Sequence, residues 1–436
     1  MEDTPRSQTT STKLQRIAEQ ARDHPDYTFT TLAHLMDVEL LREAYRRTRK
    51  DGAPGVDAVT AKEYGTHLEE NLLALHARLV SGAYQATPVK RIWLEKEGGK
   101  LRPIGIPAFE DKLVERAVVM LLSAVYEQDF YDFSYGFREG HSAHQALEAL
   151  RGWGMANAGG WIVDADITGF FDNLPHEQLQ MLLQRRIKDG TLLRLIGKWL
   201  KAGVVDGTNL TYPDRGVPQG GVISPLLANV FLHYVLDDWF VRDVRPRLKG
   251  RATLLRFADD FVIVCERQDD ARRLLEVLPK RFARFGLELH PTKTQLIDFQ
   301  KPSQGGPDGG GKRTFDFLGF THYWAKSRWG SWVIKRKTAR KRLKRTMTAI
   351  WVWCKGHRHL PMREQHRMLS LKLRGHYQYY GIRGNSRWLN AVYSYAKKAW
   401  RYWLGNRSQK SAIPWEKFAR MQAVFPLPPP KIVHSI

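Results

Sequence analysis

The sequence predicts an α+β fold in which an antiparallel sheet is followed by a basic helical region. From Trp161 onward, the expected order is strand, helix, helix, two strands, helix, strand, which is a split β-α-β-β-α-β arrangement. From Thr321 to Ser411, 23 Lys and Arg residues accompany a single acid, Glu364, so 22 of the 24 excess positive charges lie there. With 436 residues, the chain has room for about three domains of ordinary size.

The first 160 residues are expected to be helical around one hairpin. Residues 1–25 are rich in Ser, Thr, Gln and charge and show no apolar period, so we expect them to be disordered. Helical spacing follows from Leu32 to Tyr45 and from Leu68 to Leu79. The segment 88–107 predicts two strands joined by a Gly-Gly turn, and a helix capped by Asp111 is expected to run to about Tyr126.

The elements expected after residue 160 form the split sheet. They are a strand in WIVDAD (161–166), a helix at about 176–200, a buried helix at 222–240, the hairpin 254–264, a helix at 270–285 and a strand at 294–299. In a sheet of this order, the first strand and the hairpin are central neighbours. A Gly-rich connector, 303–312, then leads to FDFLGF at 315–320.

Two adjacent acids, Asp259 and Asp260, lie where the strands of the hairpin LLRFADDFVIV are joined. Adjacent like charges at a half-buried turn repel each other, and a divalent cation removes this penalty by neutralising both. The predicted strand order lets Asp166, at the end of the first strand, face them. For the pair alone, an acidic turn facing water is the alternative. Periodicity does not reject Asp164 as a further candidate, whereas Asp172 lies beyond the strand end.

Three converging carboxylates suit a pair of divalent ions. Two-metal phosphoryl transfer needs ions about 3.5–4 Å apart, one activating the attacking hydroxyl and one stabilising the leaving oxygen. Mg²⁺ suits this arrangement because it takes few carboxylates and completes its octahedron with phosphate oxygens and water. We therefore expect two Mg²⁺ ions, with Mn²⁺ as a substitute.

Aromatic rings are interleaved with the cations of the region Thr321–Ser411. They are Trp324, Trp329, Trp332, Trp351, Trp353, Tyr377, Tyr379, Tyr380, Trp388, Trp400, Tyr402 and Trp403. Cations hold phosphates and flat rings stack on bases, so this composition predicts a nucleic-acid surface. The alternative is a solvated basic face over an aromatic helical core, which must hold for some of the rings.

The two cysteines, Cys265 and Cys354, are far apart and belong to neither a CxxC nor a Cys/His ligand pattern. This usage fits a reducing cytoplasm and excludes a zinc ribbon. The start of the chain is polar and acidic, and no run approaches the roughly 18 apolar residues of a spanning helix. We expect a soluble cytoplasmic protein with no membrane partner, and the oligomeric state is left open.

A series of ordered blocks resembles those of group II intron-encoded reverse transcriptases. FADD at Phe257–Asp260 resembles the Tyr/Phe-Ala-Asp-Asp box, and DADITGFFDNLPH resembles the first catalytic block, whose metal ligand falls on Asp166. The other blocks are GAPGVDAVT, KLRPIGIPAFEDKLVERAV, SYGFREGHSAHQAL, GVPQGGVISPLLANVFLH, FGLELHPTKT, FDFLGF, LRGHYQYYG and RSQKSAIPWEKF. The resemblance covers about residues 30–436.

This resemblance implies a right-hand polymerase with fingers, a ferredoxin-like antiparallel palm sheet and a helical thumb, or maturase, domain. The implied division is an N-terminal extension and fingers at 26–160, a palm with some inserted finger elements at 161–325, and the basic helical thumb at 326–436. No Cys pair or His-Asn-His stretch follows the thumb-like region. We therefore expect the family's C-terminal endonuclease domain to be lacking.

The resemblance also implies a nucleotide site. Lys96 and Arg102 match the family's triphosphate contacts, where fixed cations oppose the nucleotide charge; an exposed charged hairpin is the alternative. Phe171 matches the steric gate, and a ring there would collide with a ribose 2′-OH, so deoxynucleotides are expected unless the ring only packs in the core. Gln219 matches the nucleotide-pocket glutamine, although an amide that supports a turn would look the same. Lys293 is expected to orient phosphate or a catalytic carboxylate, or to be a surface lysine.

Metal, primer and RNA contacts are implied as well. The implied metal set is Asp166, Ile167, Asp259 and Asp260. Leu318 and Gly319 match the primer grip, where a tight turn lets the backbone approach the 3′ end. The RNA contacts expected in the basic region are Arg374, Arg383 and Lys397. Two departures from the family pattern, Glu95 for proline and Phe257 for tyrosine, remove no metal ligand.

The function expected from these residues is RNA-directed DNA synthesis by two-metal transfer of deoxynucleotides onto a primer 3′ end. The expected partners are an RNA template, a DNA or RNA primer, deoxynucleoside triphosphates and an intron RNA whose splicing the protein assists. Two alternatives are a domesticated free-standing reverse transcriptase in defence or repair, and an RNA-binding splicing cofactor that needs no polymerase activity.

Overall fold

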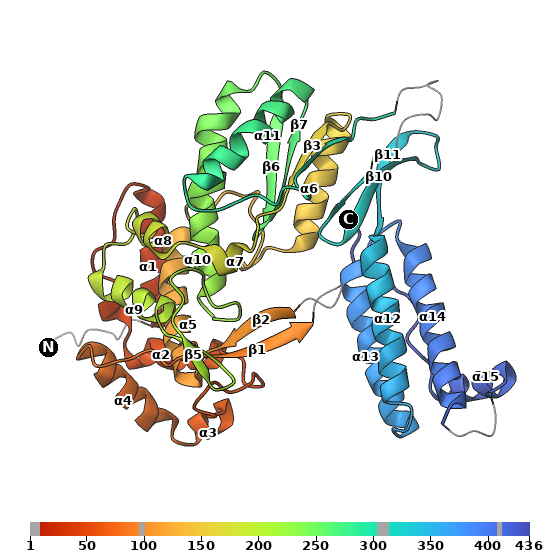
Figure 1. Cartoon of the computed structure of the whole chain (residues 1–436), viewed down its shortest axis with the longest axis horizontal. Coiled ribbons are helices and arrows are strands. Elements are labelled where there is room, and N and C mark those ends of the chain that lie inside the picture. The colour runs from red at the N-terminus through yellow and green to blue at the C-terminus, as the bar shows by residue number, and fades with distance from the viewer. Residues whose placement is uncertain (1–8, 96–100, 303–313, 408–411) are drawn as a thin grey trace, which may run out of the picture. The chain divides into compact units, whose positions relative to one another are not determined.

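The chain forms two compact units in the computed structural model, which describes residues 9–95, 101–302, 314–407 and 412–436 (Figure 1). The first unit comprises Met1–Ser142 and Val163–Leu296, and the second comprises Ala143–Ile162 and Ile297–Ile436. These units cut across the expected division at residues 160 and 325. The reason is that helix α6 (Ala143–Ala156) packs against β11 (Trp332–Thr338), far along the chain.

The N-terminal part of the first unit is helical. Its elements are α1 (Thr10–Asp23), η1 (Ala33–Leu35), α2 (Val38–Arg47), α3 (Ala61–Thr66), α4 (Leu68–Val80) and α5 (Phe109–Tyr126). The expectation of disorder over residues 1–25 is wrong from Thr10 onward. The hydroxyl of Thr9 caps α1, and the buried residues Ile17 and Ala21 lie on a helix that packs against α5.

A four-stranded sheet, in the order β2-β1-β4-β5, lies beside these helices. Its strands are β1 (Val89–Glu95), β2 (Leu101–Ile106), β4 (Val204–Asp206) and β5 (Asn209–Thr211). Strands β1 and β2 are antiparallel, which confirms the hairpin predicted at 88–107; its turn lies outside the described residues. The expected cap of α5 is wrong, because Asp111 lies in the first turn and accepts hydrogen bonds from the Tyr84 hydroxyl and the Thr87 amide.

The central sheet has the order β6-β7-β3-β8, with strands β3 (Trp161–Ala165), β6 (Ala252–Phe257), β7 (Asp260–Cys265) and β8 (Gln295–Asp298). This is the order that the split β-α-β-β-α-β arrangement predicts. Strands β6 and β7 are antiparallel, and Phe257 pairs with Asp260 at the closed end. Helix α11 (Gln268–Ala283) packs on β7, whose residues after Asp260 are all buried.

Two helices that were predicted as continuous are interrupted. The segment 176–200 contains α8 (His176–Leu183) and α9 (Gly190–Leu200), because Asp189 caps α9 by accepting hydrogen bonds from the amides of Thr191 and Leu192. The segment 222–240 begins as α10 (Ser224–Leu232) and continues as the π-helical turns η3 (His233–Asp237) and η4 (Phe240–Val244), before η5 (Arg245–Arg247).

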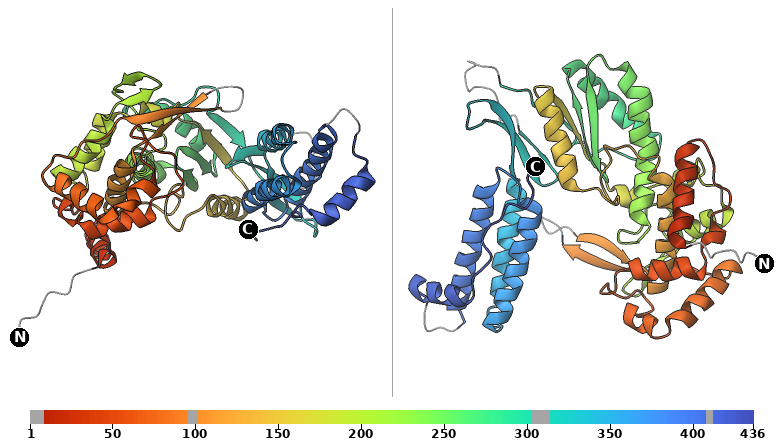
Figure 2. Two further views of the ribbon diagram at one scale, coloured as in Figure 1. Left: turned by 90° about the horizontal axis from the view of Figure 1, so that it is seen from below. Right: turned by 180° about the vertical axis from the view of Figure 1, so that it is seen from behind.

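The second unit combines α6, a three-stranded sheet and a helical bundle. The sheet has the order β11-β10-β9, with β9 at Thr314–Phe317 and β10 at Phe320–Lys326, and both pairings are antiparallel. The helices are α12 (Arg340–Gly356), α13 (Met362–Tyr380), α14 (Ser386–Gly405) and α15 (Trp415–Val424). Helices α12, α13 and α14 run alongside one another (Figure 2) and share a core that contains Leu373, Val392 and Trp400. Among the described residues, every helix is too short or too polar to cross a membrane.

Candidate active site

The turn between β6 and β7 presents the two adjacent acids. Ala258 takes a positive φ of 58° and is buried, Asp259 is half-buried, and Asp260 is exposed at the first position of β7. Gly136 lies against this turn so closely that a β-carbon there would meet the Ala258 nitrogen at 2.3 Å. The SYGF segment therefore supports the turn from behind, and only glycine fits at position 136.

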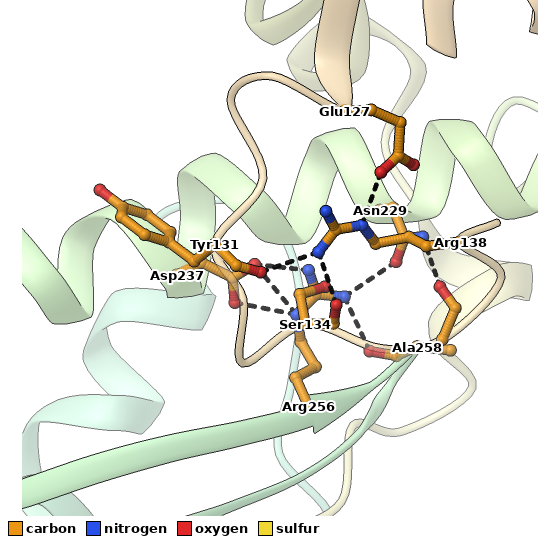
Figure 3. A network of polar contacts seen from close by, with 9 residues as sticks. Glu127, Tyr131, Ser134, Arg138, Asn229, Asp237, Arg256 and Ala258 are labelled. Carbon is orange, nitrogen blue, oxygen red and sulfur yellow. Dashed lines mark hydrogen bonds and ion pairs between the residues drawn. The ribbon is translucent and has the colours of Figure 1, made fainter. Parts of the chain in front are cut away.

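A fully buried arginine, Arg256, holds the turn from within (Figure 3). Its guanidinium donates to the carboxylate of Asp237 on η3, with 2.8 Å between Nε and Oδ1, and to Oδ1 of Asn229 on α10 at 2.9 Å. The same group donates to the carbonyl of Ala258 at 3.1 Å. Because its charge is paired and its donors are used, the buried ion pair ties the turn to α10 and η3.

A second buried arginine, Arg138, holds the segment behind the turn (Figure 3). It forms an ion pair with Glu127, 2.9 Å between Nε and Oε2, and donates to the carbonyls of Tyr131 and Ser134 at 2.8 and 2.6 Å. Asn229 completes the connection by donating to the carbonyl of Gly136 at 2.7 Å. Sequence reasoning missed this network, although a charged residue inside the apolar run LLRF was a visible signal.

Asp166 follows β3 directly, beside the hairpin. Its carbonyl accepts a hydrogen bond from the His290 amide at 2.7 Å, which fixes the backbone after the strand. Its carboxylate Oδ2 lies 2.6 Å from Nζ of Lys293. Of the roles left open for Lys293, the structure thus shows contact with the candidate catalytic carboxylate. Because β3 neighbours β7 and such sheets are antiparallel, the end of β3 lies beside the start of β7.

The donor set for a metal consists of carboxylate oxygens from Asp166, Asp259 and Asp260, and these hard ligands fit Mg²⁺. Ile167 is buried, so its backbone carbonyl is the group that could join them. Over the ranges that the structure describes, no three His, Cys, Asp or Glu side chains are gathered closely enough to form a metal group. The candidate ligands share one end of the sheet through the strand order, and Oδ2 of Asp166 is in contact with Lys293.

The nucleotide-site candidates Arg102 and Gln219 are in direct contact. The Arg102 guanidinium on β2 donates from Nε to Oε1 of Gln219 at 2.5 Å, and Gln219 donates from Nε2 to Oδ1 of Asp172 at 3.0 Å. Phe171, on the short helix α7 (Phe170–Asn173), lines a cavity of about 120 Å³ together with Asp172 and Gln219. Lys96 lies outside the described residues. Asp172, which the sequence placed beyond the strand end, thus belongs to the pocket.

Leu318 and Gly319 form the turn between β9 and β10 in the second unit. Both have positive φ, 48° and 80°, between the paired residues Phe317 and Phe320. Two consecutive left-handed residues make a tight turn that suits close backbone approach. The carbonyl of Leu318 accepts a hydrogen bond from the Tyr379 hydroxyl at 2.8 Å, a contact that sequence reasoning missed.

The expected RNA contacts lie on the helical bundle. Arg374, on α13, and Arg383 are exposed, and Nζ of Lys397, on α14, lies 4.7 Å from the centre of the Tyr393 ring. The aromatic residues divide as expected, since Trp400 is buried in the bundle core while Trp329 is 88% exposed. Exposed cations and exposed rings are therefore both present in this unit, although part of the aromatic content is core.

Comparison with known sequences identifies related proteins. Residues 94–322 match the family described as reverse transcriptase (RNA-dependent DNA polymerase). The protein YkfC of Escherichia coli is 35% identical over 284 residues, which is 57% of this chain and 74% of YkfC. The group II intron-encoded protein LtrA of Lactococcus lactis is 36% identical over 237 residues, 54% of this chain but 39% of LtrA.

An intron maturase is also among the relatives. Nuclear intron maturase 1, mitochondrial, of Arabidopsis thaliana is 30% identical over 97 residues, 22% of this chain and 13% of the relative. The family match covers more than half of the chain, and it includes the acids of the hairpin and of β3 together with the nucleotide-pocket residues on α7 and before α10. The chain therefore belongs to the reverse transcriptase family, RNA-directed DNA polymerases, and is similar to the group II intron-encoded protein LtrA.

Proposed function

We propose that this protein extends a primer 3′ end with deoxynucleotides on an RNA template, using Asp166, Asp259 and Asp260 as ligands for two Mg²⁺ ions. The observation that supports this proposal most directly is the strand order β6-β7-β3, which puts Asp166 beside the turn that presents the other two acids. When bound, the ions supply an activated primer hydroxyl and a neutralised leaving pyrophosphate. The side chains around the two ions bind and select the nucleotide.

Each proposed nucleotide contact has a physical basis in the charge or shape of the side chain. Arg102 and Lys96 oppose the triphosphate charge, and Gln219 aligns the Arg102 guanidinium through the 2.5 Å hydrogen bond. Phe171 fills the space where a ribose 2′-OH would lie, which selects deoxynucleotides. Lys293 keeps the Asp166 carboxylate oriented and neutralised until an ion replaces it.

We assign the central sheet to a palm, the N-terminal helices and β1/β2 to an extension and fingers, and α12–α15 to a thumb. The turn of Leu318 and Gly319 would then present backbone to the primer end. The exposed cations of the bundle support a second activity, in which the thumb binds intron RNA and assists its splicing. LtrA and the Arabidopsis protein are named for introns, which favours this role over a domesticated enzyme.

The decisive experiment is primer extension on an RNA template with Mg²⁺, comparing wild type with Asp259→Asn and Asp269→Asn. Asp269 is a partly exposed acid on α11 paired with Arg267, so its change removes the same charge away from the site. We expect the Asp259 change to abolish synthesis and the Asp269 change to leave it intact, with RNA affinity preserved in both. Synthesis by the Asp259 variant at the wild-type rate would refute the metal assignment. An RNA-binding splicing cofactor that needs no polymerase activity would instead assist splicing equally well in all three proteins without templated synthesis by any of them.

A further inference from the structure

The loop 216–223, which contains Gln219, is held along its first half by backbone hydrogen bonds. The amides of Gly216 and Val217 donate to the carbonyls of Leu174 and Phe171 at 2.8 and 2.7 Å. This arrangement joins the loop to the backbone of the candidate steric gate. The first half of the loop is thus fixed relative to Phe171, and the position of Gln219 depends on how the other half of the loop is fixed.

Strand β2 limits the middle of the loop. The Gln219 carbonyl accepts from the Gly105 amide at 2.7 Å. Gly220 has a φ of 120°, and a β-carbon there would meet the Gly105 carbonyl oxygen at 2.5 Å. A side chain at position 220 would push the loop away from β2, so the close approach requires glycine. This contact fixes the position of the Gln219 backbone relative to β2, the strand that carries Arg102.

The second half of the loop ends at a buried carboxylate, Glu115 of α5. Its Oε2 accepts from the amides of Val222 and Ile223 at 2.6 and 3.1 Å, and the residue is 4% exposed. Ile223 precedes α10 and caps it with no side-chain hydrogen bond of its own. Glu115 thus supplies the missing cap from another helix, and negative charge is favourable at that helix end.

We propose that Glu115 is a positioning residue for the nucleotide pocket, and that its ionised carboxylate holds loop 216–223 so that Gln219 and Phe171 are presented to the incoming deoxynucleotide. This inference rests on the proposed polymerase function. Glu115 touches no reacting atom and acts through the loop.

Keeping the Glu115 carboxylate ionised in this buried position lowers the stability of the folded state. The pKa of Glu115 is raised to about 7, mainly by burial and also by the charge of Asp111 one turn away, although the two amide hydrogen bonds and Lys112 act to lower it. Asp111 and Glu115 are the charged residues among those that line the small cavity under the loop, and the facing loop residues Val217 and Pro218 are apolar. Because the folded-state pKa lies above the ordinary 4.5, stability contributed by the neutral form is lost as pH rises toward 7. The role in the pocket is inferred from the geometry, since Glu115 accepts hydrogen bonds from two amides of the loop that carries Gln219.

The test compares wild type, Glu115→Gln and Asp111→Asn in steady-state primer extension between pH 6 and 8. Asp111 is an equally buried carboxylate of the same helix that bonds Tyr84 and Thr87 and not the loop, so it is the matched control. An amide accepts the two loop hydrogen bonds without charge assistance, and such bonds are roughly half as strong. We expect Glu115→Gln to raise the KM for deoxynucleotide about tenfold at pH 8 with kcat nearly unchanged.

The pH profile separates positioning from a purely structural role. The wild-type KM should rise as pH falls through 7, whereas the KM of Glu115→Gln should stay high and flatter. The KM of Asp111→Asn at pH 8 should follow wild type, and its rise should begin at a lower pH because the charge of Asp111 raises the pKa of Glu115. Titration of the triphosphate is common to all three proteins and cancels in the comparison. The midpoint of thermal unfolding of Glu115→Gln at pH 8 should equal or exceed that of wild type.

An unchanged KM and pH profile in Glu115→Gln would overturn the inference, as would an equal effect of Asp111→Asn. These results differ from failure of the proposed function, in which wild type itself would not extend a primer on RNA. A Glu115→Leu variant provides a second measurement, because it removes the loop hydrogen bonds altogether. It should raise the KM more than Glu115→Gln does, and an equal KM for the two variants would also count against the inference.

Discussion

The hydroxyl of Tyr379 donates a hydrogen bond to the backbone carbonyl of Leu318, 2.8 Å away, and so joins helix α13 to the turn between β9 and β10. The Tyr379 ring also stacks on Phe320, with 5.8 Å between ring centres. Tyr379, which belongs to the LRGHYQYYG block, therefore stabilises the candidate primer-grip turn.

Replacing Tyr379 with Phe should therefore weaken primer binding while keeping the ring. Loss of one hydrogen bond corresponds to about 1 kcal/mol, so the KM for primer-template should rise about fivefold. Tyr402→Phe is the control, because Tyr402 is exposed on α14 and lies outside the turn. Equal KM values for both variants would remove Tyr379 from this role.

Replacing Arg256 with Met should destabilise the first unit by about 3–5 kcal/mol, because Asp237 would be left buried and unpaired. The midpoint of urea unfolding measures the change. The double variant Arg256→Met/Asp237→Leu should recover stability but not synthesis, since the donor to the Ala258 carbonyl stays absent. Full activity in the double variant would show that the turn needs no such support.

Replacing Phe171 with Ala should admit ribonucleotides. Removing the ring opens the cavity that it lines beside Gln219, so the ratio of kcat/KM for ribonucleotides to that for deoxynucleotides should rise roughly tenfold or more. Phe171→Tyr keeps the ring and should keep the discrimination. If Phe171→Ala still rejects ribonucleotides as strongly as wild type, the ring only packs the core.

Neutralising Arg374, Arg383 and Lys397 together as glutamines should weaken RNA binding and flatten its salt dependence. Each lost phosphate contact reduces the slope of log K against log salt by about 0.7–0.9, so the slope should fall by about 2–3. Arg42→Gln serves as a control, because Arg42 is already paired with Glu39 and Glu69. An unchanged slope would place the RNA surface elsewhere.

Replacing Lys293 with Met should lower the Mg²⁺ concentration needed for half-maximal synthesis, because the ion would no longer compete with the ammonium group for Asp166. The pair is partly exposed, so the change should be at most about fivefold. The maximal rate should fall, since Asp166 loses the group that orients it. Titration of activity with Mg²⁺ checks both effects, and an increased Mg²⁺ requirement would contradict the competition.

The parts predicted well from the sequence depend on local patterns and topological rules. The hairpin of Asp259 and Asp260 is predictable because mostly apolar, β-prone runs flank the two acids, and the strand order follows from the split arrangement. The pair Asp189-Gly190 is itself a signal for the break between α8 and α9, although one continuous helix is predicted there from the sequence. The partners of Arg256 are not predictable, because they lie 19 and 27 residues away, Asp237 on a π-helical turn that the apolar pattern does not reveal and Asn229 on α10.

The anchoring of the acidic turn by Arg256 implies that its geometry is not a property of the hairpin alone. The guanidinium draws its partners from α10 and η3, and Asn229 carries the connection to the segment before Arg138. A β6–β7 hairpin transplanted into another sheet would bring the acids without this anchor and would lose their placement. The smallest transferable catalytic element of this enzyme is thus the hairpin together with α10, η3 and residues 131–138.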